Sequence, residues 1–350
     1  MKQGGNWCWS DTMGFPFPEY IQLYPTTRCN QRCSFCFNPE IRPIPDLTFK
    51  NALLLLDILT ENRIRDIDIM GGEPFLIPWL TDFVQTGISK GMSLNISTNG
   101  SMPGRLEHLR GISRTYFNIG ISLEGSTSEK HNRMTGSNNF SSALESINRL
   151  LVLSLNPLVK TVLNHETADD IQHIVNLIRE MGVRRYYLIH MDLLHNKETV
   201  IKNAVHYTAF LKFYEKIRRK NPDIAVHRVH ASCFDKHSLP SGVRCAGGVR
   251  KLSILPDGSV FPCNLFHHMK GFALGNIFRD RFTDIWSHPR LDLFRRHQEN
   301  RCSISRCENH ASCTGGCPAH GYYLSGDPDV TDIRCMKALN SHPATDNPRL

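Results

Sequence analysis

Short apolar runs alternate with amphipathic stretches through the first two thirds of the chain. Six runs predict β-strands, at residues 20–25, 67–72, 94–98, 117–123, 158–164 and 186–191. Helical periodicity marks 46–62, with Asp46 as the expected N-cap, and also 79–91, 141–154 and 168–182. Parallel strands need helical crossovers, so this alternation predicts an α/β fold with a parallel sheet and outer helices. In barrel-like sheets of this kind, chemistry is carried at the carboxyl ends of the strands.

The pattern changes after a polar helix at about 205–225. Short strands, turns, Gly, Pro and most of the cysteines follow it. We therefore expect an N-terminal extension at 1–18, a core domain at 19–215, a cysteine-rich domain at 216–340 and a flexible tail at 341–350.

Composition narrows the possible classes only slightly. The 350 residues are 40% hydrophobic and 21% charged, which is ordinary for a globular chain. No signal peptide is visible, and the longest aliphatic run, 52–56, is too short to span a bilayer. The net charge of +8 is spread along the chain. We expect a cytoplasmic protein with a solvated surface and neither membrane nor nucleic-acid partners.

Twelve cysteines change the picture more than the charge does. At fixed short spacings in a reducing compartment, cysteines are more typical of metal ligands than of disulfides. Cys8, between Trp7 and Trp9, is expected to be a packing residue.

Cys29, Cys33 and Cys36 follow the first predicted strand with the spacing C-x-x-x-C-x-x-C. Three thiolates can hold three irons of a [4Fe–4S] cluster and leave the fourth iron without a protein ligand. No histidine occurs between residues 1 and 107, which disfavours a local zinc site. The count of three protein ligands indicates a reactive cluster if another group binds the open iron.

Polar motifs end the next three strands. GGEP at 71–74 offers backbone that can pair with an amino group, and Glu73 can accept from that group or cap locally. STNG at 97–100 carries hydroxyl and amide groups suited to ribose, SLEG at 122–125 follows, and Arg133 is a nearby carboxylate partner. Each motif alone is more typical of a turn. Their agreement in order and location favours a binding site.

Over residues 18–215 this arrangement resembles the radical S-adenosylmethionine (SAM) superfamily, whose motif is C-x-x-x-C-x-φ-C with φ aromatic; Phe35 occupies φ. The resemblance implies a partial (β/α)6 TIM-like barrel in which the amino and carboxylate groups of SAM chelate the open iron. By motif, Gly71, Gly72 and Glu73 would meet the methionyl amine, Ser97 and Asn99 the ribose, Ser122 and Arg133 the methionyl carboxylate, and the backbone at Phe35 the adenine. SLEG departs from the family's usual S-I-D-G but retains Ser122.

The mechanism implied by the resemblance begins with electron transfer from the cluster held by Cys29, Cys33 and Cys36 into SAM. This gives methionine and a 5′-deoxyadenosyl radical that abstracts hydrogen from substrate. No catalytic acid, base or hydrogen donor is assigned; Cys233, Tyr186 and Tyr187 are unranked candidates for it.

The second half carries another cysteine set. PDG at 256–258 predicts a hairpin with Cys263 at the end of one strand and Cys245 at the start of its partner. The region resembles the SPASM domain, which holds two auxiliary [4Fe–4S] clusters. The resemblance implies that Cys245, Cys263 and Cys317 serve one cluster and that Cys302, Cys307, Cys313 and Cys335 serve the other. Cys302 and Cys307 show C-x-x-x-x-C where C-x-x-C is usual.

The first auxiliary set is one ligand short. Cys233, twelve residues before Cys245, is a candidate for the missing ligand, and a plain thiol is the alternative. Zinc is the alternative metal for the whole region.

The resemblance implies an enzyme that modifies a ribosomal peptide or protein by crosslinking, epimerisation or oxidation. A dehydrogenase or epimerase of a small molecule such as a sugar or aminoglycoside is the alternative, and a non-catalytic Fe–S or zinc scaffold is the alternative from another class. Expected partners are the substrate and an electron donor such as flavodoxin or ferredoxin. About twenty residues precede the first strand, so a leader-peptide-binding element is expected to be a separate protein or absent.

Overall fold

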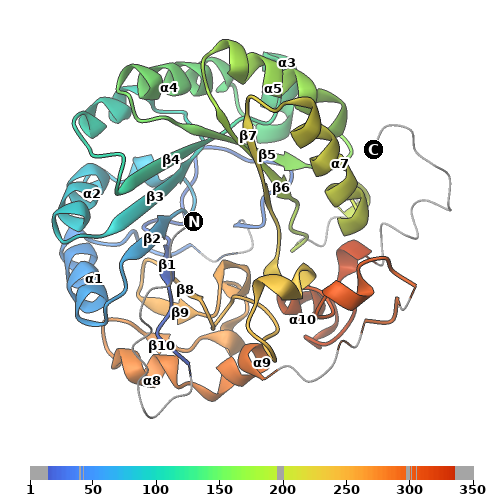
Figure 1. Cartoon of the computed structure of the whole chain (residues 1–350). Coiled ribbons are helices and arrows are strands. Elements are labelled where there is room, and N and C mark those ends of the chain that lie inside the picture. The colour runs from blue at the N-terminus through green and yellow to red at the C-terminus, as the bar shows by residue number, and fades with distance from the viewer. Residues whose placement is uncertain are drawn as a thin grey trace.

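The computed structural model describes residues 15–38, 41, 43–194, 201–296, 300, 302–304 and 306–335. Cys8, most of the predicted N-terminal extension and the predicted tail lie outside these residues. A single ten-stranded sheet runs in the order β10-β9-β8-β1-β2-β3-β4-β5-β6-β7. The sheet curves into a ring with helices on its outer side (Figure 1).

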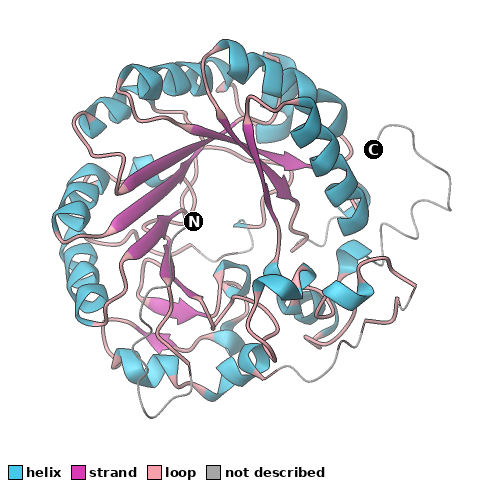
Figure 2. Cartoon of the chain, viewed as in Figure 1, coloured by secondary structure: helices cyan, strands magenta, loops and turns pink. Residues whose placement is uncertain are grey.

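The six predicted strands are present and parallel, which confirms the predicted fold class. They are β1 (Tyr20–Leu23), β2 (Asp66–Ile69), β3 (Ser93–Thr98), β4 (Phe117–Ser122), β5 (Leu158–Leu163) and β6 (Arg185–His190). The helices of this part are α1 (Phe49–Glu61), α2 (Leu80–Ser89), α3 (Ser128–Thr135), α4 (Phe140–Val152), α5 (Ile171–Glu180) and α7 (Tyr207–Lys220), arranged around the strands in Figure 2. Between them are the 3₁₀ turns η2 (Pro74–Leu76), η3 (Pro103–Leu109) and η4 (Ala168–Asp170).

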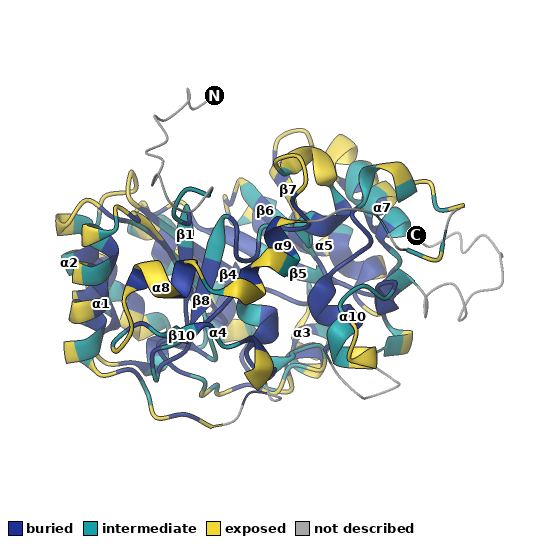
Figure 3. Cartoon of the chain, turned by 90° about the horizontal axis from the view of Figure 1, so that it is seen from below, coloured by how far each residue is buried: buried dark blue, intermediate teal, exposed yellow. Residues whose placement is uncertain are grey.

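Each strand has one apolar face and one more polar face. In β3, Leu94, Ile96 and Thr98 are buried, whereas Ser93, Asn95 and Ser97 are partly exposed. The apolar face packs against the helices, since a side chain at Gly87 of α2 would meet Leu94 at 2.9 Å. Buried residues accordingly concentrate on the strands and the sheet-facing sides of the helices (Figure 3). The polar residues face the interior of the ring, and we call this side the inner face of the sheet.

The N-terminus of α1 differs from the prediction. The N-cap is Thr48, whose hydroxyl accepts from the Asn51 amide at 3.2 Å, so the expectation for Asp46 was wrong. Asp46 instead accepts from the Thr26 hydroxyl at 2.6 Å and pairs with Arg28. Its carboxylate therefore fixes the loop after β1 rather than the helix.

The sheet continues beyond the six expected strands. β7 (Ala225–Val229) pairs in parallel with β6 and was not predicted, because only Val226 in it is buried and no alternation is visible. β8 (Lys251–Ile254) pairs in parallel with β1, and β9 (Ser259–Phe261) returns antiparallel to it. The cysteine-rich part thus shares one sheet with the barrel, and the expected boundary at 215 falls inside α7.

The remaining elements are short. They are β10 (Gly275–Asn276), α8 (Phe282–Trp286), α9 (Asp292–Arg295) and α10 (Pro318–Ser325), with 3₁₀ turns η5 (Ser232–Phe234), η6 (Lys236–Ser238), η7 (Asn264–Phe266), η8 (Lys270–Phe272), η9 (Pro289–Leu291) and η10 (His310–Ser312). Among the described helices, none has the length and apolar character needed to cross a bilayer.

Candidate active site

The loop after β1 gathers Cys29, Cys33 and Cys36 at the carboxyl end of the strand. The Cys36 amide donates to the Cys33 carbonyl at 3.1 Å. The loop also bonds to the end of α3, through the amides of Arg32 and Ser34, at 3.0 and 2.9 Å from their acceptor carbonyls. Burial raises the pKa of the Cys33 thiol, and the neighbouring Cys36 and Cys29 add to the shift. The three thiols therefore share one small site.

The glycines of GGEP allow the end of β2 to approach this loop closely. A side chain at Gly71, where φ is +130°, would lie 2.5 Å from the Thr26 carbonyl oxygen, and one at Gly72 would lie 1.8 Å from that of Arg28. The Gly72 amide donates to Thr26 at 3.0 Å, and the Glu73 amide donates to Arg28 at 2.8 Å. Any larger residue at these two positions would separate the strand end from the cysteine loop.

Glu73 takes the local capping role that the sequence left open. Its carboxylate, in a side chain only 1% exposed, accepts from the Phe75 amide at 3.0 Å, the Thr98 hydroxyl at 2.7 Å and the Asn99 amide at 2.8 Å. These bonds join the ends of β2 and β3. At this motif, the backbone therefore remains as the group able to meet an amine.

Asn99 also supports the cysteine loop. Its side-chain nitrogen donates to the Asn30 side chain at 2.8 Å and lies 3.9 Å from the Cys29 sulfur. Its side-chain oxygen accepts from the backbone amide of Ser101. Phe35, inside the loop, packs against a small apolar cluster that includes Met191 and Ile333. The loop is thus fixed on several sides before any cofactor binds.

The structure does not bring Arg133 to the other candidate residues. Its side chain is 54% exposed, and its guanidinium lies 3.6 Å from Glu129 on the same helix. Ser97 and Ser122 do lie on the inner face, where the Ser97 hydroxyl accepts from the Lys160 ammonium. Lys160 was not anticipated, although its place in the alternation of β5 could have revealed it.

A row of hydrogen-bonded polar side chains crosses the inner face, nearer the amino ends of the strands than Ser97 and Ser122. Asn95 donates to Asp68 at 2.8 Å, Asn118 donates to Asn95 at 3.1 Å, and Arg185 donates to Asn118 at 3.2 Å. Tyr187 stacks edge-on with His227 at 5.2 Å. The other tyrosine considered as a hydrogen donor, Tyr186, is 0% exposed and lies on the opposite, helix-facing side.

Four buried cysteines come together in the cysteine-rich region, and Cys233 is one of them. The thiols of Cys233 and Cys317 share a hydrogen bond. A methyl group on Gly247 would lie 3.5 Å from the Cys245 sulfur and 3.6 Å from the Cys263 Cβ. Burial, with the charges of Cys263 and Cys317, raises the pKa of Cys245 to about 12. The structure thus places Cys233 beside the three cysteines that were one ligand short.

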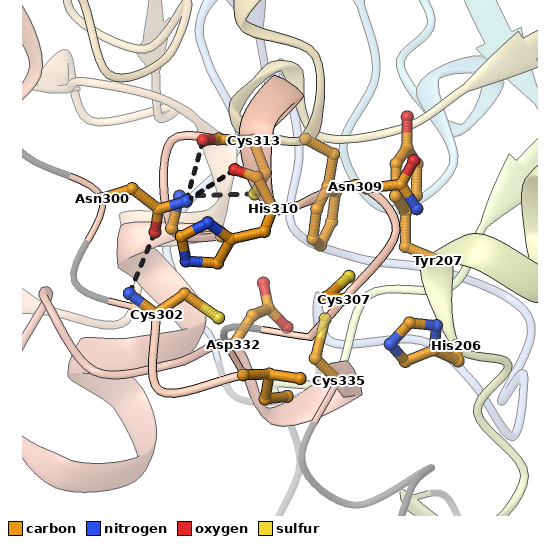
Figure 4. A pocket seen from close by; sticks show the side chains of 14 residues that line it. His206, Tyr207, Asn300, Cys302, Cys307, Asn309, His310, Cys313, Asp332 and Cys335 are labelled. Carbon is orange, nitrogen blue, oxygen red and sulfur yellow. Dashed lines mark hydrogen bonds between the residues drawn. The ribbon is translucent and has the colours of Figure 1, made fainter.

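The other four cysteines line a common pocket. Figure 4 shows the sulfurs of Cys302, Cys307 and Cys335 pointing into the same region, with Cys313 on its far side. His206 and Tyr207 at the start of α7 complete one wall. The longer spacing from Cys302 to Cys307 therefore still delivers both residues to one pocket.

Asp332 lies between the two cysteine sets. It lines this pocket, and its carboxylate accepts from the Cys317 amide at 2.9 Å. Arg334, 0% exposed, binds it at 2.8 Å and also binds Asp192 at 3.0 Å. Burial opposes ionisation of Asp332, but Arg334 and His320 outweigh it and hold the pKa of the carboxyl below its usual range.

All eight cysteines of this part offer thiol sulfur, the donor that iron–sulfur clusters use. Within the described ranges, no three His, Cys, Asp or Glu side chains form a group able to hold a single metal ion. Cluster thiolates each bind a separate iron and so need not converge on one point.

Two family matches cover most of this architecture. Residues 23–198 match the radical SAM superfamily, and residues 245–314 match an iron–sulfur cluster-binding domain called SPASM. The chain belongs to the radical SAM superfamily. This radical SAM enzyme therefore uses SAM with a [4Fe–4S] cluster, and its SPASM domain holds auxiliary iron–sulfur clusters.

Similar proteins align with nearly the whole of this chain. The antilisterial bacteriocin subtilosin biosynthesis protein AlbA of Bacillus subtilis is 24% identical over 89% of this chain and 68% of its own. The PqqA peptide cyclase of Ruegeria pomeroyi is 23% identical over 95% of this chain and 91% of its own. Streptococcus suis SuiB, in a crystal structure with its precursor peptide SuiA, shares the fold with a TM-score of 0.77 at 18% identity, over 91% of this chain and 76% of that chain.

Proposed function

We propose that this enzyme modifies a ribosomal peptide or protein, by forming a crosslink, epimerising a residue or oxidising one. The observation that carries the proposal is the match to a peptide cyclase over 95% of this chain and 91% of that protein, which includes both the barrel and the cysteine-rich region. The precursor peptide bound by SuiB, a protein of the same fold, supports the same substrate class. We further propose that the enzyme acts in the cytoplasm.

We assign Cys29, Cys33 and Cys36 as ligands of the SAM-binding cluster. Two auxiliary [4Fe–4S] clusters complete the proposal. Their ligands are Cys233, Cys245, Cys263 and Cys317 for the first, and Cys302, Cys307, Cys313 and Cys335 for the second. The proximity of Cys233 to Cys317, and the pocket shared by the other four, support these two sets.

The chain's own residues hold and orient the cofactor. When bound, SAM and the reduced cluster supply a 5′-deoxyadenosyl radical that abstracts hydrogen from the substrate. The backbone at Gly71 and Gly72 would meet the methionyl amine, the inward serines would meet polar groups of SAM, and Phe35 would approach adenine with its backbone. Glu73 and Asn99 act one step away, because their side chains fix the loop that carries the cysteines.

Electrons must reach the cluster from outside the chain. We propose flavodoxin or ferredoxin as the donor, and a separate protein as the site of leader-peptide recognition where the substrate has a leader.

Metal content and SAM cleavage test the cluster assignment. After anaerobic reconstitution we expect about twelve irons per chain, from three four-iron clusters, with formation of 5′-deoxyadenosine. Changing Cys29, Cys33 and Cys36 together to Ala should leave about eight irons and abolish cleavage. Cleavage that persists in this variant would contradict the assignment. Loss of four irons in Cys233→Ala would support Cys233 as a cluster ligand. An unchanged iron count would show that Cys233 is not a ligand.

The substrate class is tested with a short peptide encoded beside the gene. We expect a change in that peptide that requires SAM and reductant, read as lost hydrogens by mass spectrometry or as deuterium taken up from heavy water. Turnover of a sugar or aminoglycoside in the same assay, with the peptide unchanged, would favour the small-molecule alternative.

A further inference from the structure

Lys160 is an ionisable side chain on the inner face of the barrel that the proposed function does not use. It lies in the middle of β5, where it is partly buried. Its register partner on β4 is Ser122. From there the side chain crosses to β3, where its ammonium donates to the Ser97 hydroxyl. The lysine side chain therefore starts beside Ser122 and ends at Ser97, the two serines that the motifs place at SAM.

The path of this side chain depends on Gly120. A Cβ at Gly120 would lie 2.2 Å from the Lys160 Cε and 2.9 Å from its Nζ. The φ of Gly120 is not positive, so its backbone conformation does not require a glycine. The absence of a side chain at this position instead leaves the space that the Lys160 side chain occupies. This part of the sheet is shaped around one extended lysine.

The ammonium of Lys160 has bonding capacity to spare. An ammonium can donate three hydrogen bonds, and the one recorded for Lys160 goes to Ser97. Asp68 is the carboxylate that influences it electrostatically, and among the described residues Lys160 forms no ion pair. Burial lowers the pKa of Lys160 to about 8, and the attraction of Asp68 only partly opposes this. A buried cation without a close counter-ion favours an anionic ligand.

We propose that Lys160 is the cation that binds the methionyl carboxylate of SAM in this enzyme. The motif-based candidate for that role, Arg133, lies on the outer side of α3 in a pair with Glu129. Lys160 instead adjoins Ser122, the hydroxyl assigned to the same carboxylate, and contacts Ser97, assigned to the ribose. The carboxylate then accepts from both the ammonium and the serine, which orients the methionine end of SAM toward the cysteine loop.

Decarboxylated SAM tests this inference directly. It keeps the sulfonium, amine, ribose and adenine of SAM and lacks the carboxylate. Binding of both compounds is measured by anaerobic titration calorimetry on reconstituted wild type and Lys160→Met, which has similar length and no charge. Loss of a charged hydrogen-bonded pair should weaken SAM binding roughly 10- to 100-fold and leave decarboxylated SAM within about twofold. Comparing the two proteins for each ligand separately removes the iron's own contribution, because both proteins contain the same cluster.

Two further variants guard against a trivial result. Lys90→Met removes an exposed lysine that pairs with Asp57 on the outer surface, and it should leave both affinities unchanged. Gly120→Ala keeps the charge but displaces it from Ser97, so it should reduce the preference for SAM as Lys160→Met does. Each variant is first checked for wild-type iron content and melting temperature, and Gly120→Ala decides the matter if Lys160→Met fails that check.

The outcomes separate this inference from the proposals on which it rests. Equal weakening of both ligands, or unchanged SAM binding, would overturn the role of Lys160 and leave SAM cleavage intact. Wild type that neither binds SAM nor cleaves it would instead overturn the cofactor assignment. The test requires no peptide substrate, so a wrong substrate class does not affect it.

Discussion

The barrel and the cysteine-rich region both bury apolar side chains, but they differ in the polar and charged groups that they bury. The strands of the barrel bury aliphatic side chains under α1 to α5, and their polar residues meet on the inner face. The cysteine-rich region has helices of five, four and eight residues, and it buries Arg244, Arg334 and His320 at 2%, 0% and 0% exposure. It also buries large apolar side chains, such as Phe266 and Trp286, in the same core cluster as the barrel. We infer that apolar packing stabilises both regions and that metal and ion pairs add to it in the cysteine-rich one.

Removal of iron should expose this difference most clearly. Few apolar side chains of residues 306–335 are buried, and metal binding and folding are coupled where little core exists. Chelation should therefore open residues 306–335 to limited proteolysis while 49–194 stays protected. Fragment masses identify the cleavage sites. The variant with Cys29, Cys33 and Cys36 changed to Ala is the control, because it keeps the auxiliary clusters and should resist cleavage. Equal digestion of both parts after chelation would contradict the comparison.

Loss of the carboxylate at Asp332 is expected to have the next largest effect. Asp332→Ala leaves Arg334 buried with only Asp192 as a charged partner, at a cost of about 3 kcal/mol or more. Urea denaturation of the reconstituted protein measures this loss. Asp329→Ala is the matched control, because that carboxylate pairs with buried Arg244 but is itself 34% exposed. A larger loss for the control would show that burial does not determine the cost.

Glu73→Gln tests a polar junction inside the barrel. The carboxylate accepts three hydrogen bonds, and the amide group would turn a donor toward one of those donors. We expect about 1–3 kcal/mol lower stability and weaker SAM binding, because the cysteine loop rests on this junction. Glu107→Gln, at an exposed carboxylate, should change neither. Normal stability with lost SAM binding would instead point to a direct role for the Glu73 carboxylate.

The smallest expected effect is the pH dependence of SAM affinity. Lys160 has its pKa lowered to about 8 by burial, so it is charged below that pH and loses its proton above it. SAM affinity should be level up to about pH 7 and fall by up to about tenfold at pH 9. Asp68 faces Lys160 from β2, and Arg185 lies on the same face from β6. Lys160→Met should give a flat profile, and an identical slope in that variant would assign the titration elsewhere.

The sequence predicted six strands and the parallel sheet because each strand is a short apolar run and amphipathic stretches lie between the runs. It did not predict β7, where one buried residue gives no alternation, or the N-cap Thr48, because Asp46 was equally suited to cap and is held instead by Thr26 and Arg28. The pairing of β8 with β1 is also absent from any local pattern, since its partners are about 230 residues apart.

The candidate site likewise has features that the sequence predicted and features that only the structure showed. Cysteine spacing and the motif GGEP were enough to show the resemblance that implies the cofactor, because ligands of one cluster and glycines of one close approach lie within a few residues of each other. The position of Cys233 beside Cys317, the outward position of Arg133 and the local capping role of Glu73 came only from the structure. So did Lys160, whose neighbours Ser97 and Gly120 lie on two other strands. Periodicity decides which face of a strand a side chain takes, whereas its neighbours across the sheet depend on register and curvature, which only the tertiary structure sets.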